Sequence, residues 1–100
     1  MFRLIRTVRV KFDKEAEARL WAKEIADLVN KKYPGHALEA CSEVFGANGT
    51  IHWTLTYADL ADVQTLNAKL SADEAYQTLA NKGVDYVIDD SRRDLLIRSI

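Results

Sequence analysis

Seven polar side chains that could bind or act on a small molecule recur at alternating positions in three segments of the chain. They are Arg3, Thr7, Arg9, Glu43, His52, Thr54 and Thr56. Alternate residues of a β-strand point to one face of a sheet, so neighbouring strands would bring these side chains together. Convergent polar groups within an apolar enclosure are what a ligand pocket requires. We therefore predict that the seven residues bind a ligand; alternatively, the same face forms a hydrogen-bonded dimer interface or contacts water.

His52 is the candidate for proton transfer, because it is the one histidine within a regular predicted element and imidazole titrates near neutrality. Glu43 and Thr54 are the residues expected to orient it. The alternative is a half-buried polar residue without a catalytic role. His36 follows Pro34 and Gly35 in a turn and is the weaker candidate.

The sequence contains no pattern typical of a cofactor site. No group of His, Cys, Asp and Glu has metal-ligand spacing, and the segment 46–49 lacks the strand-to-helix setting of a phosphate loop. Cys41 is the single cysteine, and its neighbours Glu39 and Glu43 would raise rather than lower the pKa of a thiol. We expect neither a metal nor another cofactor.

Length and charge restrict the class of protein. A chain of 100 residues has the size of one domain, so residues 1–100 are expected to form a single core. The net charge of -1 removes the bulk attraction that nucleic-acid binders use. The segment from Met1 to Arg6 is too short in apolar residues for a signal peptide or a membrane span. We expect a cytoplasmic protein with neither nucleic acid nor membrane as a partner.

Hydrophobic periodicity and turn residues predict seven elements. In chain order these are a strand over 2–12, a helix over 14–32 capped by Asp13, strands over 37–45 and 50–57, a helix from Asp59, a short helix capped at Ser71 and ending at Gly83, and a strand over 95–100. The first strand places Phe2, Leu4, Val8, Val10 and Phe12 on an apolar face. Arg6 interrupts this apolar face, and Ile5 interrupts the polar one.

The two middle strands are expected to form a hairpin. Asn48-Gly49 is a strong signal for a two-residue turn, because both residues accept positive φ. Such a turn would pair Ala47 with Thr50, Val44 with Trp53, and Ala40 with Tyr57. The last two pairs, together with Ser42 and Leu55, would then face the helices, and the polar residues would face away.

The order strand, helix, strand, strand, helix pair, strand predicts an α+β fold of the ferredoxin-like β-α-β-β-α-β kind, with a four-stranded antiparallel sheet and its helices on one face. The other face would be uncovered. A sheet with one open face is an association surface, so two copies are expected to pair into a homodimer.

The arrangement resembles the dimeric α/β barrel superfamily through its order of elements, the Ala47-Asn48-Gly49 hairpin, the helical insert 71–82 and the segment 93–98. That superfamily includes NIPSNAP-like proteins, stress-responsive barrel proteins, and monooxygenases of the antibiotic-biosynthesis and haem-degrading types. The resemblance implies a ligand cavity between sheet and helices or at the dimer interface. A haem-degrading activity would imply an axial histidine on a helix, and the second helix of this chain has none.

Three functions are compatible with these features. The first is an uncharacterised homodimeric α/β-barrel protein that binds a small organic ligand. The second is a cofactor-independent monooxygenase of the antibiotic-biosynthesis type, which needs mainly an enclosed apolar pocket. The third is a structural association domain. The charged segment Asp89-Asp90 with Arg92-Arg93 is expected to be a solvated loop, with a gate at a cavity mouth or an ion pair across the dimer as alternatives.

Overall fold

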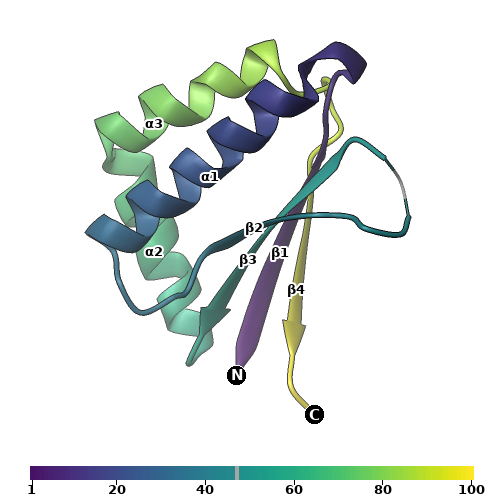
Figure 1. The fold of residues 1–100 in the computed structure, drawn as a ribbon. Helices are drawn as coiled ribbons and strands as arrows, with labels where there is room; N and C mark the ends of the chain where they lie inside the picture. The colour runs from purple at the N-terminus through teal and green to yellow at the C-terminus, as the bar shows by residue number, and fades with distance from the viewer. Residues whose placement is uncertain (47) are drawn as a thin grey trace.

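The computed structural model describes residues 1–46 and 48–100 of the chain. Its strands and helices, in chain order, are β1 (Phe2–Arg9), α1 (Glu15–Lys32), β2 (Glu39–Ser42), β3 (Thr50–Tyr57), α2 (Leu60–Ala72), α3 (Glu74–Asn81) and β4 (Arg93–Arg98), with short 3-10 turns η1 (Phe12–Lys14) and η2 (Lys82–Asp85). All seven predicted elements are therefore present. Figure 1 shows how they follow one another in space.

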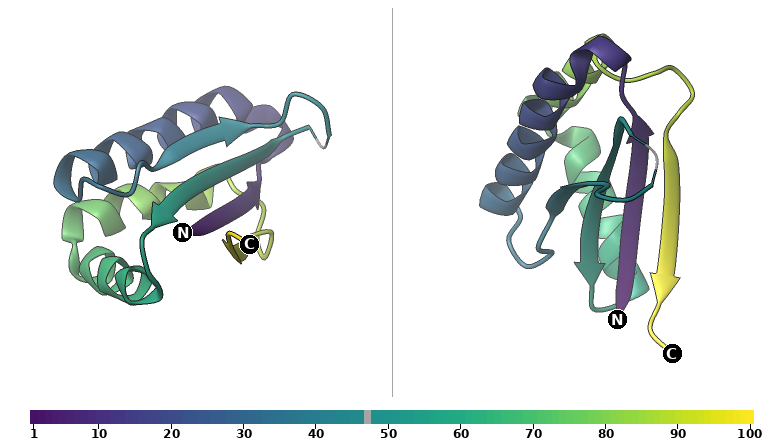
Figure 2. Two further views of the ribbon diagram at one scale, coloured as in Figure 1. Left: turned by 90° about the horizontal axis from the view of Figure 1, so that it is seen from below. Right: turned by 45° about the vertical axis from the view of Figure 1, so that its right-hand side comes forward.

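The strands form one antiparallel sheet in the order β2-β3-β1-β4, so the first and third strands are neighbours as expected. The three α-helices cover one face of the sheet, and the other face is uncovered in every view (Figure 2). This arrangement confirms the predicted α+β, ferredoxin-like fold class.

The core lies between the covered face of the sheet and the helices. The buried apolar residues are Val8, Val10, Ala18, Trp21, Ala22, Ile25, Ala26, Val29, Leu38, Ile51, Trp53, Leu55, Tyr57 and Leu66. The rings of Trp21 on α1 and Trp53 on β3 meet edge to face, with centroids 5.3 Å apart. Such a pair adds stabilisation beyond the burial of area and fixes α1 over the middle of the sheet.

The predicted hairpin register is wrong by four residues. Ala40 pairs with Trp53 rather than Tyr57, and β2 ends at Ser42 while β3 begins at Thr50, so the two strands are not joined by a two-residue turn. A shift by an even number leaves the paired side chains of β2 and β3 on their predicted faces, which is why the apolar pattern alone could not detect the error. Val44, predicted to face the helices opposite Trp53, instead lies beyond the end of β2 and is 88% exposed. Gly46 and Gly49 both have positive φ values, which glycine adopts without strain. The predicted pairing of Ala47 lies outside the described residues.

Neither of the two predicted N-caps, Asp13 and Ser71, is correct, whereas Asp59, where the second helix was expected to begin, is its N-cap. The Asp59 side chain accepts a hydrogen bond from the Asp62 backbone N–H at 3.2 Å, as expected for an N-cap. Asp13 instead lies inside η1, and Lys14 precedes α1 without a side-chain cap. The predicted cap Ser71 belongs to the last turn of α2.

Asp73, not Ser71, caps α3, because tertiary contacts hold its carboxylate in place. The Tyr33 hydroxyl donates to this carboxylate at 2.7 Å and the Lys32 ammonium at 3.1 Å, while the Tyr76 backbone N–H donates at 3.0 Å. The carboxylate therefore fastens the end of α1 to the start of α3.

Two further sequence predictions need correction at the ends of strands. Phe12 was placed on the apolar face of the first strand, but β1 ends at Arg9 and the Phe12 side chain is 95% exposed. The final strand begins at Arg93 rather than at Leu95 and ends before Ile100.

Candidate functional site

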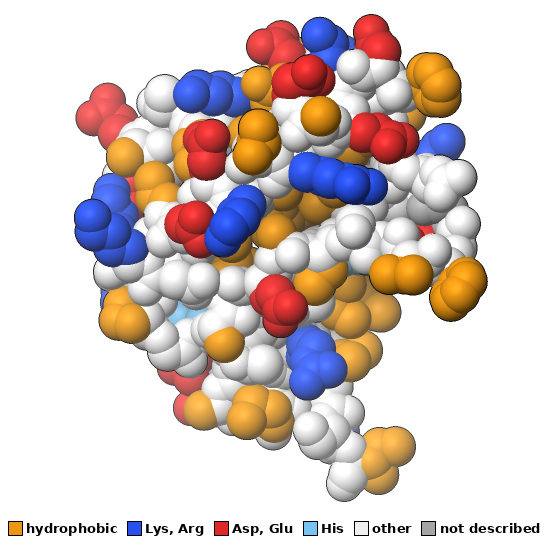
Figure 3. Space-filling view, in the orientation of Figure 1, with side chains coloured by type: hydrophobic (Ala, Val, Ile, Leu, Met, Phe, Trp, Pro, Cys, Tyr) orange, Lys and Arg blue, Asp and Glu red, His pale blue; other side chains and the backbone are white. Residues whose placement is uncertain are grey.

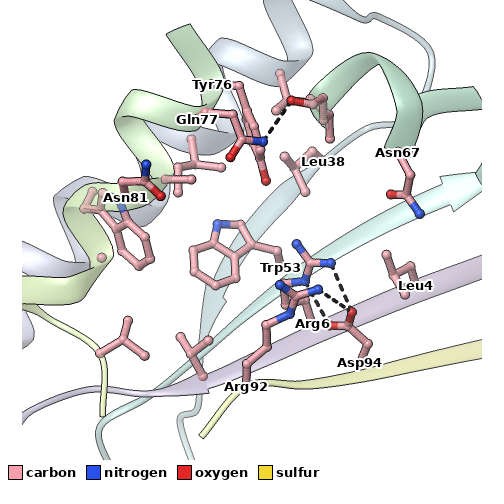
Figure 4. Close-up of a pocket in the computed structure, with 18 of the residues that line it drawn as sticks. Leu4, Arg6, Leu38, Trp53, Asn67, Tyr76, Gln77, Asn81, Arg92 and Asp94 are labelled. Carbon is pink, nitrogen blue, oxygen red and sulfur yellow. Dashed lines mark hydrogen bonds and ion pairs between the residues drawn. The ribbon is translucent and has the colours of Figure 1, made fainter. Parts of the chain in front are cut away.

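A cavity of about 730 Å³ lies between the covered face of the sheet and the helices. This volume falls within the range of sites that hold drug-sized ligands. Its walls come from β1, β3, β4, α1, α2, α3 and the segment that follows η2. Figure 4 shows side chains of these elements around the cavity, with Trp53 near its centre and Tyr76 and Gln77 across from Arg6.

One end of the cavity carries a cluster of three charged side chains. Strand pairing places Arg6 of β1 directly opposite Asp94 of β4. The Arg6 guanidinium donates through Nε to Oδ1 of Asp94 at 2.8 Å and through Nη2 to Oδ2 at 3.0 Å. Arg92 donates through Nη2 to the same Oδ2 at 3.0 Å. Two guanidinium groups therefore share one carboxylate (Figure 4).

The cluster stays ionised in its partly buried setting. Burial alone would lower the pKa of Arg6, but the hydrogen bond and charge of Asp94 more than offset this, so the pKa is raised. Hydrogen bonds from Arg6 lower the pKa of Asp94 to about 2, with burial opposing them and Arg92 adding to them. Asp94 is thus a carboxylate, and both arginines are cations, throughout the neutral range.

Aromatic side chains form much of the remaining wall. The Trp53 indole N–H donates to the Ala22 carbonyl at 3.1 Å, and the Trp21 indole N–H donates to the Leu79 carbonyl at 2.8 Å. These bonds fix both rings against the cavity. Burial raises the pKa of the Tyr57 hydroxyl, with Arg6 acting in the opposite direction, so this group is a neutral phenol. The wall therefore suits a flat molecule that presents both apolar and polar groups.

The seven residues predicted from the sequence lie away from this cavity, on or beside the open face of the sheet. Three of them meet in one hydrogen-bonded chain. The Thr7 hydroxyl lies 2.7 Å from Nδ1 of His52, and Nε2 of His52 lies 2.8 Å from Oε1 of Glu43. Glu43 was predicted to orient His52, and the second orienting group is Thr7 rather than the predicted Thr54.

The other four predicted residues do not join that chain through any hydrogen bond the structure describes. The Thr56 hydroxyl donates to the His36 carbonyl at 3.1 Å. Arg3 and Arg9 are exposed on β1, and Thr54 is half-buried on β3. Ligand binding by this face and proton transfer by His52 stay predictions.

Sequence reasoning missed the residues that line the cavity, although two of them left a signal. Arg6 interrupts the apolar face of its strand, and a charged residue on such a face needs a partner or a role. Arg92 belongs to the charged segment that had a cavity mouth among its alternatives, and Asp89, Asp90 and Arg92 do line the cavity.

Other chemistry finds little support in the structure. The Cys41 thiol has a raised pKa, first through burial and then through the charge of Glu39, which makes it a weaker nucleophile. Among residues 1–46 and 48–100, no group of three or more His, Cys, Asp or Glu is placed to hold a metal ion. In the same residues no helix has the length and apolar character to cross a membrane.

Comparison with solved structures defines the class of protein. A NIPSNAP domain protein from Burkholderia xenovorans superposes with a TM-score of 0.83 at 17% identity, covering 100% of this chain and 95% of that one. A NIPSNAP family protein of unknown function from Agrobacterium tumefaciens gives 0.81 at 20% identity, covering 99% and 87%. An antibiotic biosynthesis monooxygenase gives 0.77 at 13% identity, covering 100% and 99%. The fold is thus the ferredoxin-like one shared by NIPSNAP domains and antibiotic biosynthesis monooxygenases.

The family follows from the sequence itself. Residues 1–90 match the model of a family of unknown function, DUF6039, and the chain belongs to that family. No curated protein has significant similarity to the chain.

Proposed function

We propose that this protein is a homodimer that binds a small organic ligand in the cavity between its sheet and its helices. The observation that carries the proposal is the cavity of about 730 Å³, with aromatic walls and a charged cluster at one end. A concave, partly open volume of this size that combines apolar walls with a few convergent polar groups has the make-up of a ligand site.

The homodimer is proposed from the open face of the sheet. Ile5 on β1 and Leu95 and Ile97 on β4 lie on this face, and Leu95 and Ile97 are 57% and 42% exposed. Exposed hydrophobic side chains are visible on the surface of the protomer (Figure 3). Pairing two such faces would bury these residues and the Thr7-His52-Glu43 chain in one interior.

Native mass spectrometry of the purified protein tests the assembly and the ligand together. We expect a dimer that carries a small organic adduct. Ala80 lines the cavity and Ala75 of the same helix is exposed, so Ala80→Phe should displace the adduct and Ala75→Phe should retain it. A monomer would contradict the homodimer, and an adduct that survives Ala80→Phe would contradict the cavity as its site.

A second candidate is a cofactor-independent monooxygenase of the antibiotic-biosynthesis type. The specific observation in its favour is an aromatic-walled cavity in a fold shared with proteins named for that activity. Oxygen uptake with quinol-type substrates tests it, and uptake no greater than a blank would exclude it for those substrates. If uptake occurs, unchanged turnover in His52→Ala and Arg9→Ala would refute the predicted roles of these residues. A dimer with neither adduct nor uptake would favour the structural association domain.

A further inference from the structure

The charged cluster in the cavity contains one more charged side chain than an ion pair between β1 and β4 would need. Arg6 and Asp94 alone would join β1 to β4, since each pairs directly with the other across the ladder. Arg92 adds a second guanidinium to the same carboxylate oxygen. The three groups together carry one net positive charge. They are placed beside apolar and aromatic side chains rather than on the open face of the sheet.

Placing these charged side chains in the cavity costs desolvation free energy, and a gain in folding stability does not account for their presence. Arg6 has 27% of its side chain exposed and Asp94 has 35%, so both have lost much of their hydration. Ion pairs that lose hydration are often no more stabilising than apolar residues of the same volume. A role in recognition accounts for the cluster better than a role in folding does.

The other ionisable groups of the cavity leave the charge of the cluster in place. Tyr57 and Tyr76 lie close enough to Arg6 to interact with its charge, and as phenols they are neutral. Asp89 and Asp90 also line the cavity and are exposed to water, as Arg92 is, but no ion pair among the described residues joins either carboxylate to Arg6 or Arg92. Positive charge is therefore concentrated where Arg6 and Arg92 approach the same carboxylate, on the sheet side of the cavity and beside Trp53 (Figure 4).

We propose that the cavity selects an aromatic compound with one negative charge, a carboxylate or phenolate. The anionic group binds the guanidinium N–H groups of Arg6 and Arg92 that Asp94 does not occupy, and the ring lies against Trp53. Guanidinium groups match the planar geometry of a carboxylate, and charge-assisted hydrogen bonds are the strong ones. This inference rests on the proposed function, because it names the class of ligand for the same cavity.

Two probes of the same shape separate the effect of the ligand's charge from the effect of its fit to the cavity. Naphthalene-2-carboxylate and naphthalene-2-carboxamide have the same ring and nearly the same volume, and only the first is charged at neutral pH. We expect isothermal titration calorimetry at low salt to show the carboxylate binding more tightly by about tenfold or more.

Variants of the protein then show which residues cause the preference for the carboxylate over the carboxamide. Arg92→Gln removes an exposed cation and leaves the Arg6–Asp94 pair intact, so it should fold normally and reduce the preference. The double variant Arg6→Gln/Asp94→Asn removes both inner charges without changing the net charge, and it should weaken the preference, because one of the two guanidinium groups is lost, while still binding the carboxamide. Arg93→Gln, on the neighbouring residue of β4 and outside the cavity lining, should leave the preference unchanged.

The outcomes distinguish the two proposals. Equal affinity for the two probes would overturn the anion selectivity and leave the cavity as a ligand site. Failure of both probes to bind at millimolar concentration would overturn the aromatic ligand class, whereas the proposed function is decided separately by the adduct and its loss in Ala80→Phe. A preference that survives both Arg92→Gln and the double variant would assign the anion to other residues and refute the role given to this cluster.

Discussion

Gly83 supplies a sharp test of the packing on which the cavity depends. It is buried in η2 and lines the cavity, and the Trp21 indole lies directly over it. A Cβ added at Gly83 would lie 2.6 Å from Cζ2 and 2.8 Å from Cη2 of Trp21. The ring has little freedom to withdraw, because its N–H is bonded to the Leu79 carbonyl and its faces pack against Trp53 and Tyr86.

The expected size of the effect follows from two opposing contributions. Overfilling a packed core costs about 1–3 kcal/mol, and contacts this short belong in the upper half of that range. Replacing Gly by Ala also restricts the unfolded chain, which returns about 0.4–1 kcal/mol. Gly83→Ala should therefore lower the free energy of unfolding by about 1–2.6 kcal/mol, or Tm by roughly 4–20 °C for a domain of this size.

Thermal unfolding followed by circular dichroism at one fixed protein concentration measures the change. Lys82→Ala, an exposed substitution in the same 3-10 turn, is the matched control and should leave Tm nearly unchanged. In a Trp21→Phe background the outer indole carbons are absent, so Gly83→Ala should lose most of its cost. An unchanged Tm in Gly83→Ala, or an equal cost in both backgrounds, would refute the packing described here.

Three further predictions concern other parts of the molecule. The Tyr33 hydroxyl, more than any other group, lowers the pKa of Asp73 from its usual 3.8 to about 2. The stabilisation that the ionised Asp73 provides is complete above about pH 4 and is lost as the pH falls through 2. The Tm of Asp73→Asn should therefore fall less between pH 4 and pH 2 than the Tm of the native chain. An equal fall in both proteins would contradict this assignment. Ile97→Lys should convert the proposed dimer to monomer in size exclusion with light scattering, and a persistent dimer would exclude this surface as the interface. Leu66→Ala should cost about 2–5 kcal/mol in urea unfolding, because Leu66 is 2% exposed, whereas Leu60→Ala, at 53% exposure, should cost far less.

The order of elements could be predicted from the sequence because each depends on local information. The alternation in β1 and β3, the helical spacing in α1 and the glycine after α3 are read within a single segment. The hairpin register could not be predicted in the same way. Registers that differ by two or four residues bury the same faces, so the alternation of apolar and polar residues cannot choose among them.

The N-cap of α3 could not be predicted from the sequence for a related reason. Asp73 and Ser71 are both good cap residues, and the sequence alone gives no ground for choosing the aspartate. What decides between them is the position of Lys32 and Tyr33, about 40 residues earlier in the chain, whose side chains reach Asp73 only after α1 has packed beside α3. The preference is thus a tertiary one.

The candidate site illustrates how a departure from a pattern can carry more information than the pattern. The polar face was chosen because its residues alternate regularly, and it does assemble Thr7, His52 and Glu43. Arg6 was the residue that did not fit. A guanidinium on an otherwise apolar strand face requires a counter-ion on a neighbouring element. Asp94 supplies it from a strand nearly 90 positions later. Charged residues on the covered face of the sheet, where desolvation makes a charge costly, are therefore better candidates for function than the polar residues of the open face.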